Sequence, residues 1–181
     1  MNPAPSAGSS DTSTMSAPDG RKASFSPVVA PHTRVLILGS LPGERSLAQQ
    51  RYYAHPQNQF WRLVGGVIGR DLAGMPYDAR LTALLEAGIG LWDTVASATR
   101  RGSLDAAIRD AEHNRLADLA ASLPELRAVA FNGATSARIG RALLAGSPCQ
   151  LLSLPSSSPA YAAMPFAEKL RLWRAIGEFL R

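Results

Sequence analysis

The chain has 181 residues, one cysteine and a formal net charge of +5, a length that suits one domain with a core of ordinary size. A single cysteine excludes an intramolecular disulfide, and no Cys/His pair has zinc-ligand spacing, so we expect a reducing cytoplasm and no structural metal. Without a signal peptide or a run of roughly 20 apolar residues, the protein is expected to be soluble and not exported.

The N-terminal segment, residues 1–31, is rich in Ser, Pro, Ala and Gly and has no apolar periodicity. Such a composition buries too little apolar surface to offset the entropy lost on ordering. We therefore predict a disordered tail over residues 1–31 and a folded domain over residues 32–181.

Three apolar runs predict buried strands, the first of them buried on both faces, and a fourth run predicts a short strand. The first covers residues 35–38, and the others cover residues 88–95, 127–133 and 149–154.

Helical patterns separate these runs. Asn58 can cap a helix that starts near Phe60, and Ser103 can cap one over residues 103–123. Residues 78–87 predict another helix, and two more are expected at about 134–144 and after residue 165.

Strands that alternate with helices predict an α/β fold: a single three-layer domain whose central sheet has about four mainly parallel strands flanked by helices. In such sheets a ligand binds beyond the carboxyl ends of the strands. We expect the loops after Leu38, Trp92, Phe131 and Leu154 to converge on one site. The first of these loops is long, which favours a functional role, but it has neither a dinucleotide fingerprint nor a phosphate-binding P-loop.

The excess positive charge lies in residues 34–181, where Lys169 is the only lysine and arginines supply the rest. The planar guanidinium suits phosphate contacts, so a polyanionic partner is one explanation. A GC-rich genome that favours arginine is the other, and charge alone does not separate them.

Five segments, each at a predicted strand end, resemble the uracil-DNA glycosylase superfamily; in chain order they read LILGSLPG, YYAHPQNQFWRLV, GIGLWDTVAS, FNG and LPSSSPA. They resemble its hypoxanthine-DNA glycosylase branch most and its mismatch-specific uracil/thymine-DNA glycosylase branch next. The resemblance covers about residues 34–181. It implies a monofunctional DNA repair enzyme that flips a deaminated base out of DNA, hypoxanthine first and uracil second. Hydrolysis of the N-glycosidic bond then leaves an abasic site.

The resemblance assigns Tyr53 to stacking against the flipped base and Asp93 to reading its edge. Relatives carry an asparagine where this chain has Asp93, and an ionised aspartate accepts hydrogen bonds but cannot donate them. Asp93 as a helix cap is the alternative. The resemblance also places Ser40, Leu41, His55 and Asn132 around the base, and His55 can instead simply close the loop.

Asn58 is the candidate catalytic residue. Many relatives place an Asn or Asp in the first loop, but this chain has Leu41 there, and in the hypoxanthine branch the role is assigned to the asparagine at position 58. Its amide would hold the attacking water. A helix cap is the competing role for Asn58.

A DNA-binding surface is expected around the same edge. Ser156, Ser157 and Ser158 suit phosphate contacts, although an ordinary polar turn would read the same way. Arg45, Arg51, Arg100 and Arg101 lie in loops where they could neutralise the DNA backbone. Leu154 stands where relatives carry a second polar catalytic group.

The expected partner is DNA that contains a deaminated base, with no membrane contact, no metal and no organic cofactor. We expect a monomer in the cytoplasm, associated with the nucleoid. Since no lysine is placed as a Schiff-base nucleophile, strand cleavage is not expected.

Two other functions stay open. Leu41 and Leu154 fit a damaged-DNA-binding domain that has lost catalysis. A serine hydrolase would use Ser40 with Asp93 and either His55 or His113, but the sequence lacks the GxSxG elbow.

Overall fold

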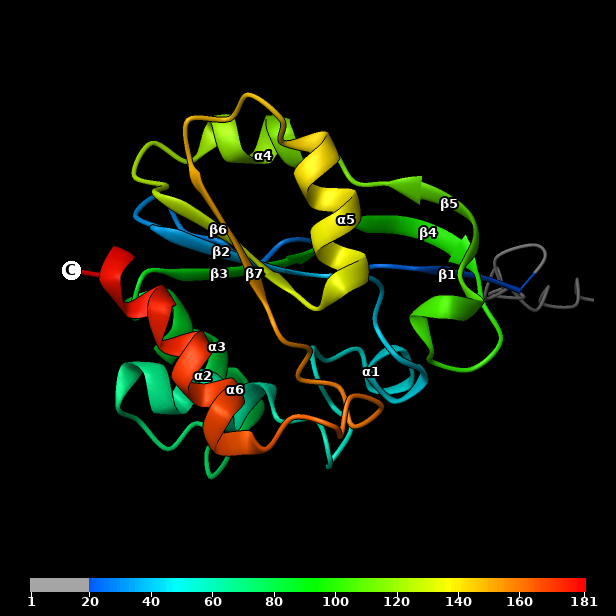
Figure 1. Ribbon diagram of the computed structural model, residues 1–181, viewed down its shortest axis with the longest axis horizontal. Helices are drawn as coiled ribbons and strands as arrows, with labels where there is room; N and C mark the ends of the chain where they lie inside the picture. Colours follow the sequence, from blue (N-terminus) through cyan, green and yellow to red (C-terminus); the bar gives the residue numbers. More distant parts are fainter. Residues whose placement is uncertain (1–19) are drawn as a thin grey trace, which may run out of the picture.

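A computed structural model of the protein describes residues 20–181 (Figure 1). No helix in this range is long and apolar enough to cross a membrane.

The centre of the molecule is a parallel sheet of four strands in the order β3-β2-β6-β7. The strands are β2 (Val35–Gly39), β3 (Ile89–Asp93), β6 (Ala128–Asn132) and β7 (Gln150–Leu154). Every residue of β2 and β6 is buried, because these inner strands have neighbours on both edges and helices on both faces. The predicted α/β fold and its four strands are confirmed.

Helices cover both faces of this sheet (Figure 1). On one face α2 (Phe60–Ile68), α3 (Tyr77–Glu86) and α6 (Phe166–Trp173) pack with Val35 and Ile37. On the other face α4 (Leu116–Ser122) and α5 (Ala134–Leu143) pack with Leu36 and Leu38. The alternation of side chains along β2 therefore joins the two cores.

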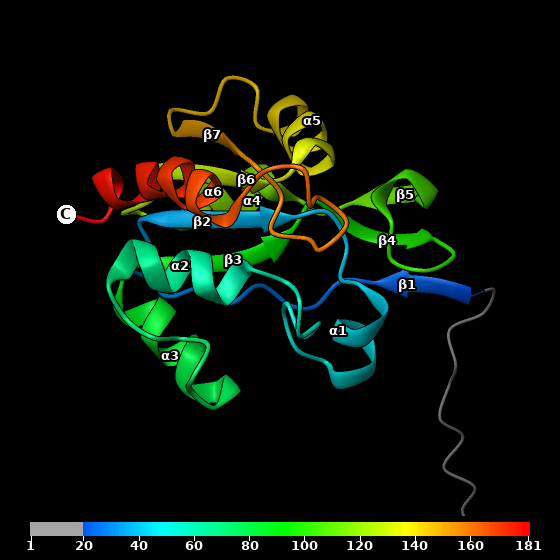
Figure 2. The ribbon, with the colours of Figure 1, turned by 60° about the horizontal axis from the view of Figure 1, so that its bottom comes forward.

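A second, antiparallel sheet contains β1 (Arg21–Ala23), β4 (Val95–Thr99) and β5 (Arg109–His113) in the order β1-β4-β5. Only Thr94 separates β4 from β3, so this small sheet begins where the large sheet ends, and Figure 2 shows it beyond the carboxyl ends of β2 and β3.

The small sheet corrects two predictions. The helix predicted over residues 103–123 is instead the 3-10 turn η2 (Asp105–Ala107), β5 and α4, because pairing with β4 overrides the helical composition of β5. The tail boundary at residue 31 is also wrong: β1 pairs with β4, and Val28 forms a bridge with Leu91. The rest of the predicted tail, residues 1–19, lies outside the described residues.

Two shorter elements complete the described part of the chain. Helix α1 (Glu44–Gln49) follows the first loop, and the 3-10 helix η3 (Arg174–Phe179) continues α6. The C-terminus is fixed at the amino ends of the strands, where the Arg34 guanidinium donates to the carbonyl of Leu180.

The contact between α5 and β6 leaves no room for a side chain at Gly140. A Cβ there would lie 2.1 Å from Cε1 of Phe131, a ring that is fully buried. We predict that Gly140→Ala lowers the free energy of unfolding by about 1–3 kcal/mol, since the helix or the ring must shift. Urea unfolding measures this. In Gly177→Ala the added methyl meets nothing within 4 Å, and equal midpoints for the two variants would contradict the prediction.

Candidate functional site

A cavity of about 290 Å³ opens at the carboxyl end of the large sheet. Its walls come from the loop after β2, the ends of β3 and β6, the loop after β7 and the turn before β5; they include Gly39, Ser40, Leu41, Arg45, Tyr53, His55, Asn58, Asp93, Leu104, Asp105, Asn132, Ser156, Ser157, Ser158 and Tyr161. The convergence of loops predicted from the strand order is therefore observed.

Asp93 and Tyr53 form the closed end of the cavity. The Asp93 carboxylate is 3 % exposed, and its Oδ2 and the Tyr53 hydroxyl have no hydrogen-bond partner within the described part of the chain. Gly39 makes their approach possible, because a Cβ there would lie 2.6 Å from Asp93 Oδ1 and 3.0 Å from the Tyr53 hydroxyl. Two buried, unpartnered polar atoms facing one cavity indicate that a polar ligand completes them.

Burial raises the pKa of Asp93 to about 7, with a further increase from the negative charge of Asp105 and an opposing decrease from Arg100. A substantial fraction of Asp93 is therefore a neutral acid near neutral pH, able to donate as well as accept. The expectation that Asp93 can only accept hydrogen bonds assumed an ionised carboxylate, and it does not hold for the neutral acid. Because the folded-state pKa of Asp93 lies above the ordinary value of 3.8, the native state loses stability as the pH rises from about 4 to about 7.

Tyr53 is held in a strained and closely packed position. Its backbone is left-handed with φ of 52°, an uncommon conformation for an aromatic residue. Its ring stacks on Phe60 with 3.9 Å between centroids and 13° between planes. One ring face is thus covered, and a ligand in the cavity can stack only on the other. Phe60 and Trp61 are buried core residues.

Asn58 lies just before Gln59, the N-cap residue of α2, and also lines the cavity. Its Oδ1 accepts a hydrogen bond of 2.9 Å from the backbone N–H of Phe60. One lone pair of Oδ1 and the amide N–H₂ remain for a ligand or water. The two roles considered for Asn58 are therefore compatible.

The loop after β7, which carries Ser156, Ser157 and Ser158, is held in place by Asn132. The Asn132 amide donates to Ser157 Oγ at 2.8 Å, and its carbonyl accepts from the Ser157 N–H at 2.9 Å. Ser157 is 1 % exposed, so its hydroxyl serves this internal contact better than a phosphate. Ser156 and Ser158 are more accessible, but each hydroxyl already accepts from a backbone N–H two residues later.

Lys169 fixes the same loop from α6. It is 1 % exposed, and its ammonium donates to the Tyr161 carbonyl at 2.7 Å and to Gln59 Oε1 at 3.0 Å. The Gln59 N–H in turn donates to the Ser157 carbonyl. Lys169 therefore has a structural role, and it does not line the cavity.

Sequence reasoning missed Asp105, which lies in the segment predicted as a helix. Its carboxylate lines the cavity, and Oδ1 accepts a 2.5 Å hydrogen bond from the Ser40 hydroxyl. No local pattern marks this residue, because only the fold brings the turn after β4 next to the loop after β2.

The four arginines expected to meet phosphates have different environments. Arg45 is exposed at the cavity, and Arg101 is exposed nearby in the chain but does not line it. The Arg51 guanidinium lies over the Tyr77 ring, 5.4 Å from its centroid.

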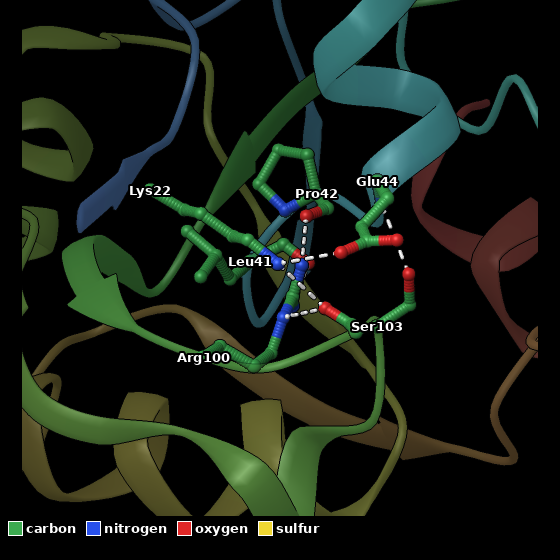
Figure 3. Close-up of polar contacts among 7 residues, drawn as sticks. Lys22, Leu41, Pro42, Glu44, Arg100 and Ser103 are labelled. Atoms are coloured by element: carbon green, nitrogen blue, oxygen red, sulfur yellow. Dashed lines mark hydrogen bonds and ion pairs between the residues drawn. The ribbon is translucent and has the colours of Figure 1, made fainter. Parts of the chain in front are cut away.

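Arg100 corrects the prediction, because it is 5 % exposed and points into the protein. It donates to the carbonyls of Leu41 at 3.2 Å, Pro42 at 2.5 Å and Gly102 at 2.9 Å (Figure 3). It thus braces the first loop rather than facing solvent.

Two further contacts tie the small sheet to the same loop (Figure 3). Lys22 from β1 pairs with Glu44 at 3.1 Å, and the Ser103 hydroxyl accepts from the Glu44 N–H at 2.9 Å. The small sheet therefore sets the position of the loop that carries Ser40 and Leu41.

The remaining predicted residues are apolar or exposed. Leu41 and Leu154 are each 6 % exposed, Leu41 against Val95 and Leu154 within the main core. His55 is exposed at the cavity mouth, and its Nδ1 accepts from the Gln57 N–H.

The geometry does not support a serine hydrolase. The Ser40 hydroxyl is directed to Asp105 rather than to a histidine, and His113 lies on the exposed strand β5. Within residues 20–181 no group of three His, Cys, Asp or Glu side chains could hold a metal ion.

Comparison with known proteins points to one family. The model of the family described as the Uracil DNA glycosylase superfamily matches residues 26–177. A hypoxanthine DNA glycosylase of Methanosarcina barkeri is 46 % identical over 116 residues, 64 % of this chain and 73 % of that protein. A second, from Methanosarcina acetivorans, is 42 % identical over 139 residues, 77 % of this chain and 87 % of that protein.

A solved structure agrees with the sequence relatives. The solution NMR structure of a candidate uracil DNA glycosylase from Methanosarcina acetivorans superposes with a TM-score of 0.80 at 39 % identity, over 88 % of this chain and 98 % of that one.

Replacing Arg100 tests its bracing role. We predict that Arg100→Met lowers the free energy of unfolding by about 1–3 kcal/mol, because buried carbonyls of the first loop lose their donor. Thermal unfolding measures the loss, and amide exchange should quicken at residues 40–46. The neighbouring Arg101 is exposed, so Arg101→Met is the matched control and should change stability by less than about 0.5 kcal/mol. Equal stability of the two variants would refute the role.

Proposed function

Since this chain belongs to the uracil DNA glycosylase superfamily, we propose that it removes hypoxanthine, the deaminated form of adenine, in preference to uracil. The protein is a monofunctional DNA glycosylase that excises deaminated bases and leaves an abasic site. The choice of hypoxanthine is supported by the two relatives that carry this base in their names and by the chemistry of Asp93.

The observation that carries the proposal is the buried, unpartnered carboxyl of Asp93 at the closed end of the cavity. Hypoxanthine presents an N–H at N1 beside a carbonyl at C6. A neutral carboxyl matches this pair, because its hydroxyl donates to O6 while its carbonyl accepts from N1–H. The raised pKa of Asp93 makes the neutral form available near neutral pH.

The neutral carboxyl also favours bond cleavage. The departing base leaves with negative charge, which a donated hydrogen bond stabilises and an ionised carboxylate would repel. Asp93 thus replaces the donor that an asparagine supplies at this position in related enzymes.

Tyr53 and Asn58 complete the base pocket. The ring face of Tyr53 opposite Phe60 would stack on the flipped base. Asn58 would use its free lone pair and amide to hold a water near C1′ of the deoxyribose while its hydrogen bond with Phe60 keeps it in place. The cavity volume, close to the lower end of about 300–1,000 Å³ for ligand sites, suits a single base.

The DNA backbone would contact the rim of the cavity. Arg45, Ser156 and Ser158 line the cavity and Arg101 is exposed. We propose that these four residues contact phosphates on either side of the flipped nucleotide. Leu104 and Tyr161 are 59 % and 40 % exposed at the same rim, where apolar side chains can contact neighbouring bases. We also propose that the enzyme acts as a monomer on the DNA of the cytoplasm.

The substrate is tested with labelled duplexes that each contain hypoxanthine, uracil, xanthine or mismatched thymine. We predict fastest release from hypoxanthine, read as alkali-sensitive cleavage, and a rate for Asn58→Ala that is about 100-fold lower. Gln57→Ala, at an exposed position in the same loop, is the control. Binding without release from any of these duplexes would identify a damage-binding protein instead.

The pH profile tests Asp93. We predict that the single-turnover rate on hypoxanthine falls as the pH rises through about 7, because ionised Asp93 can no longer donate to the base. Asp93→Asn keeps a donor that does not titrate, so it should stay active with this pH step removed. Asp93→Ala should be about 100-fold slower than the parent below pH 7, and the difference should shrink at higher pH, where the parent loses its donor. A parent rate that climbs over the same interval would exclude the neutral-acid role.

A further inference from the structure

We propose that Asp105 is a further catalytic residue, whose carboxylate faces C1′ of the flipped nucleotide and orients the attacking water. This inference rests on the proposed function. Many relatives carry a polar catalytic residue at the position of Leu41, and we assign that role to Asp105, which lies in a different loop.

The loop after β2 supplies no negatively charged side chain that could stabilise positive charge at C1′. Leu41 has no polar atom in its side chain, and Asn58 spends one lone pair of its only acceptor on the N–H of Phe60. An amide also carries no net charge. Cleavage of a glycosidic bond builds positive charge at C1′ and the ring oxygen, which a nearby carboxylate stabilises strongly in a cavity with little water.

Asp105 meets this need by position. It lines the cavity from the turn η2, and its Oδ1 is fixed by the short hydrogen bond from the Ser40 hydroxyl. Within residues 20–181 no hydrogen bond engages its Oδ2, and this atom is not among the buried polar atoms that lack a partner. Oδ2 is therefore reachable by water while Oδ1 holds the carboxylate in one orientation.

The other carboxylates at the cavity are less suited. Glu44 is exposed, and its carboxylate pairs with the Lys22 ammonium at 3.1 Å. Asp93 lies at the closed end, where the base edge belongs, and is partly neutral near pH 7. Asp105 itself contributes to that state, since its negative charge is the second cause of the raised pKa of Asp93. The two side chains thus have different roles. The neutral carboxyl of Asp93 donates to the nucleobase, and the negative charge of Asp105 stabilises the positive charge on the sugar.

In the proposed step the C1′–N9 bond breaks and its electron pair leaves with the base. The positive charge at C1′ and the ring oxygen forms next to Asp105. A water oxygen then bonds to C1′ and its proton passes to the Asp105 carboxylate, which returns it to solvent. The base anion takes one proton, from Asp93 or from solvent, so that deoxyinosine and water become hypoxanthine and an abasic sugar.

The test compares Asp105→Asn with the parent in single turnover on a hypoxanthine duplex. We expect a rate about 100-fold lower at pH 7, while binding to a duplex that contains 2′-fluoro-deoxyinosine stays equal or becomes tighter. Asp110→Asn is the matched control, since Asp110 is exposed on β5 and does not line the cavity. Ser40→Ala should lose about tenfold, because Asp105 keeps its charge but not its orientation.

A second readout separates catalysis from a structural role. Removal of the Asp105 charge should move the Asp93 step in the pH profile to lower pH, which a loosened loop would not do. If Asp105→Asn keeps the parent rate and pH profile, the inference is wrong while the proposed function stands. If the parent releases no deaminated base, the proposed function fails instead.

Discussion

The parallel pairing of β2 with its two neighbours is the constraint on which the site depends. In this register Gly39 lies beside Asp93, and Asn132 lies beside Leu154. Because all four strands run the same way, the residues that follow them meet at one edge. The absence of a side chain at Gly39 then lets the Asp93 carboxylate and the Tyr53 hydroxyl close against the backbone. A sheet of another order would scatter these groups.

The sequence predicted the parts of the fold that rest on local apolar patterns. Strands β2, β3 and β6 are almost entirely buried apolar runs, whereas in the edge strand β7 only Leu154 is buried. Most cavity residues follow one of these strands or lie in the long first loop. The small sheet was not predictable, since β5 is exposed throughout and β1 has only three residues. Asp105 and the burial of Arg100 depend on that sheet, so no pattern in the chain reveals them.

The charge inside the cavity is opposite in sign to the net charge of the chain. The chain carries an excess of arginine, yet the interior of the cavity presents the carboxyls of Asp93 and Asp105. The buried Arg100 lies behind the first loop and gives its donors to backbone carbonyls. Arg45 is exposed at this cavity, while the acidic interior is suited to the charge that would form at the sugar and the base during the proposed reaction.

The position of β1 determines where a protein fused near it would lie. Strand β1 lies beyond the carboxyl ends of the large sheet, whereas the C-terminus lies at the opposite end of that sheet (Figure 1). A fusion partner joined close to β1 would lie at the end of the sheet where we propose that DNA binds. A partner attached after Arg181 would project from the far side and leave that end open.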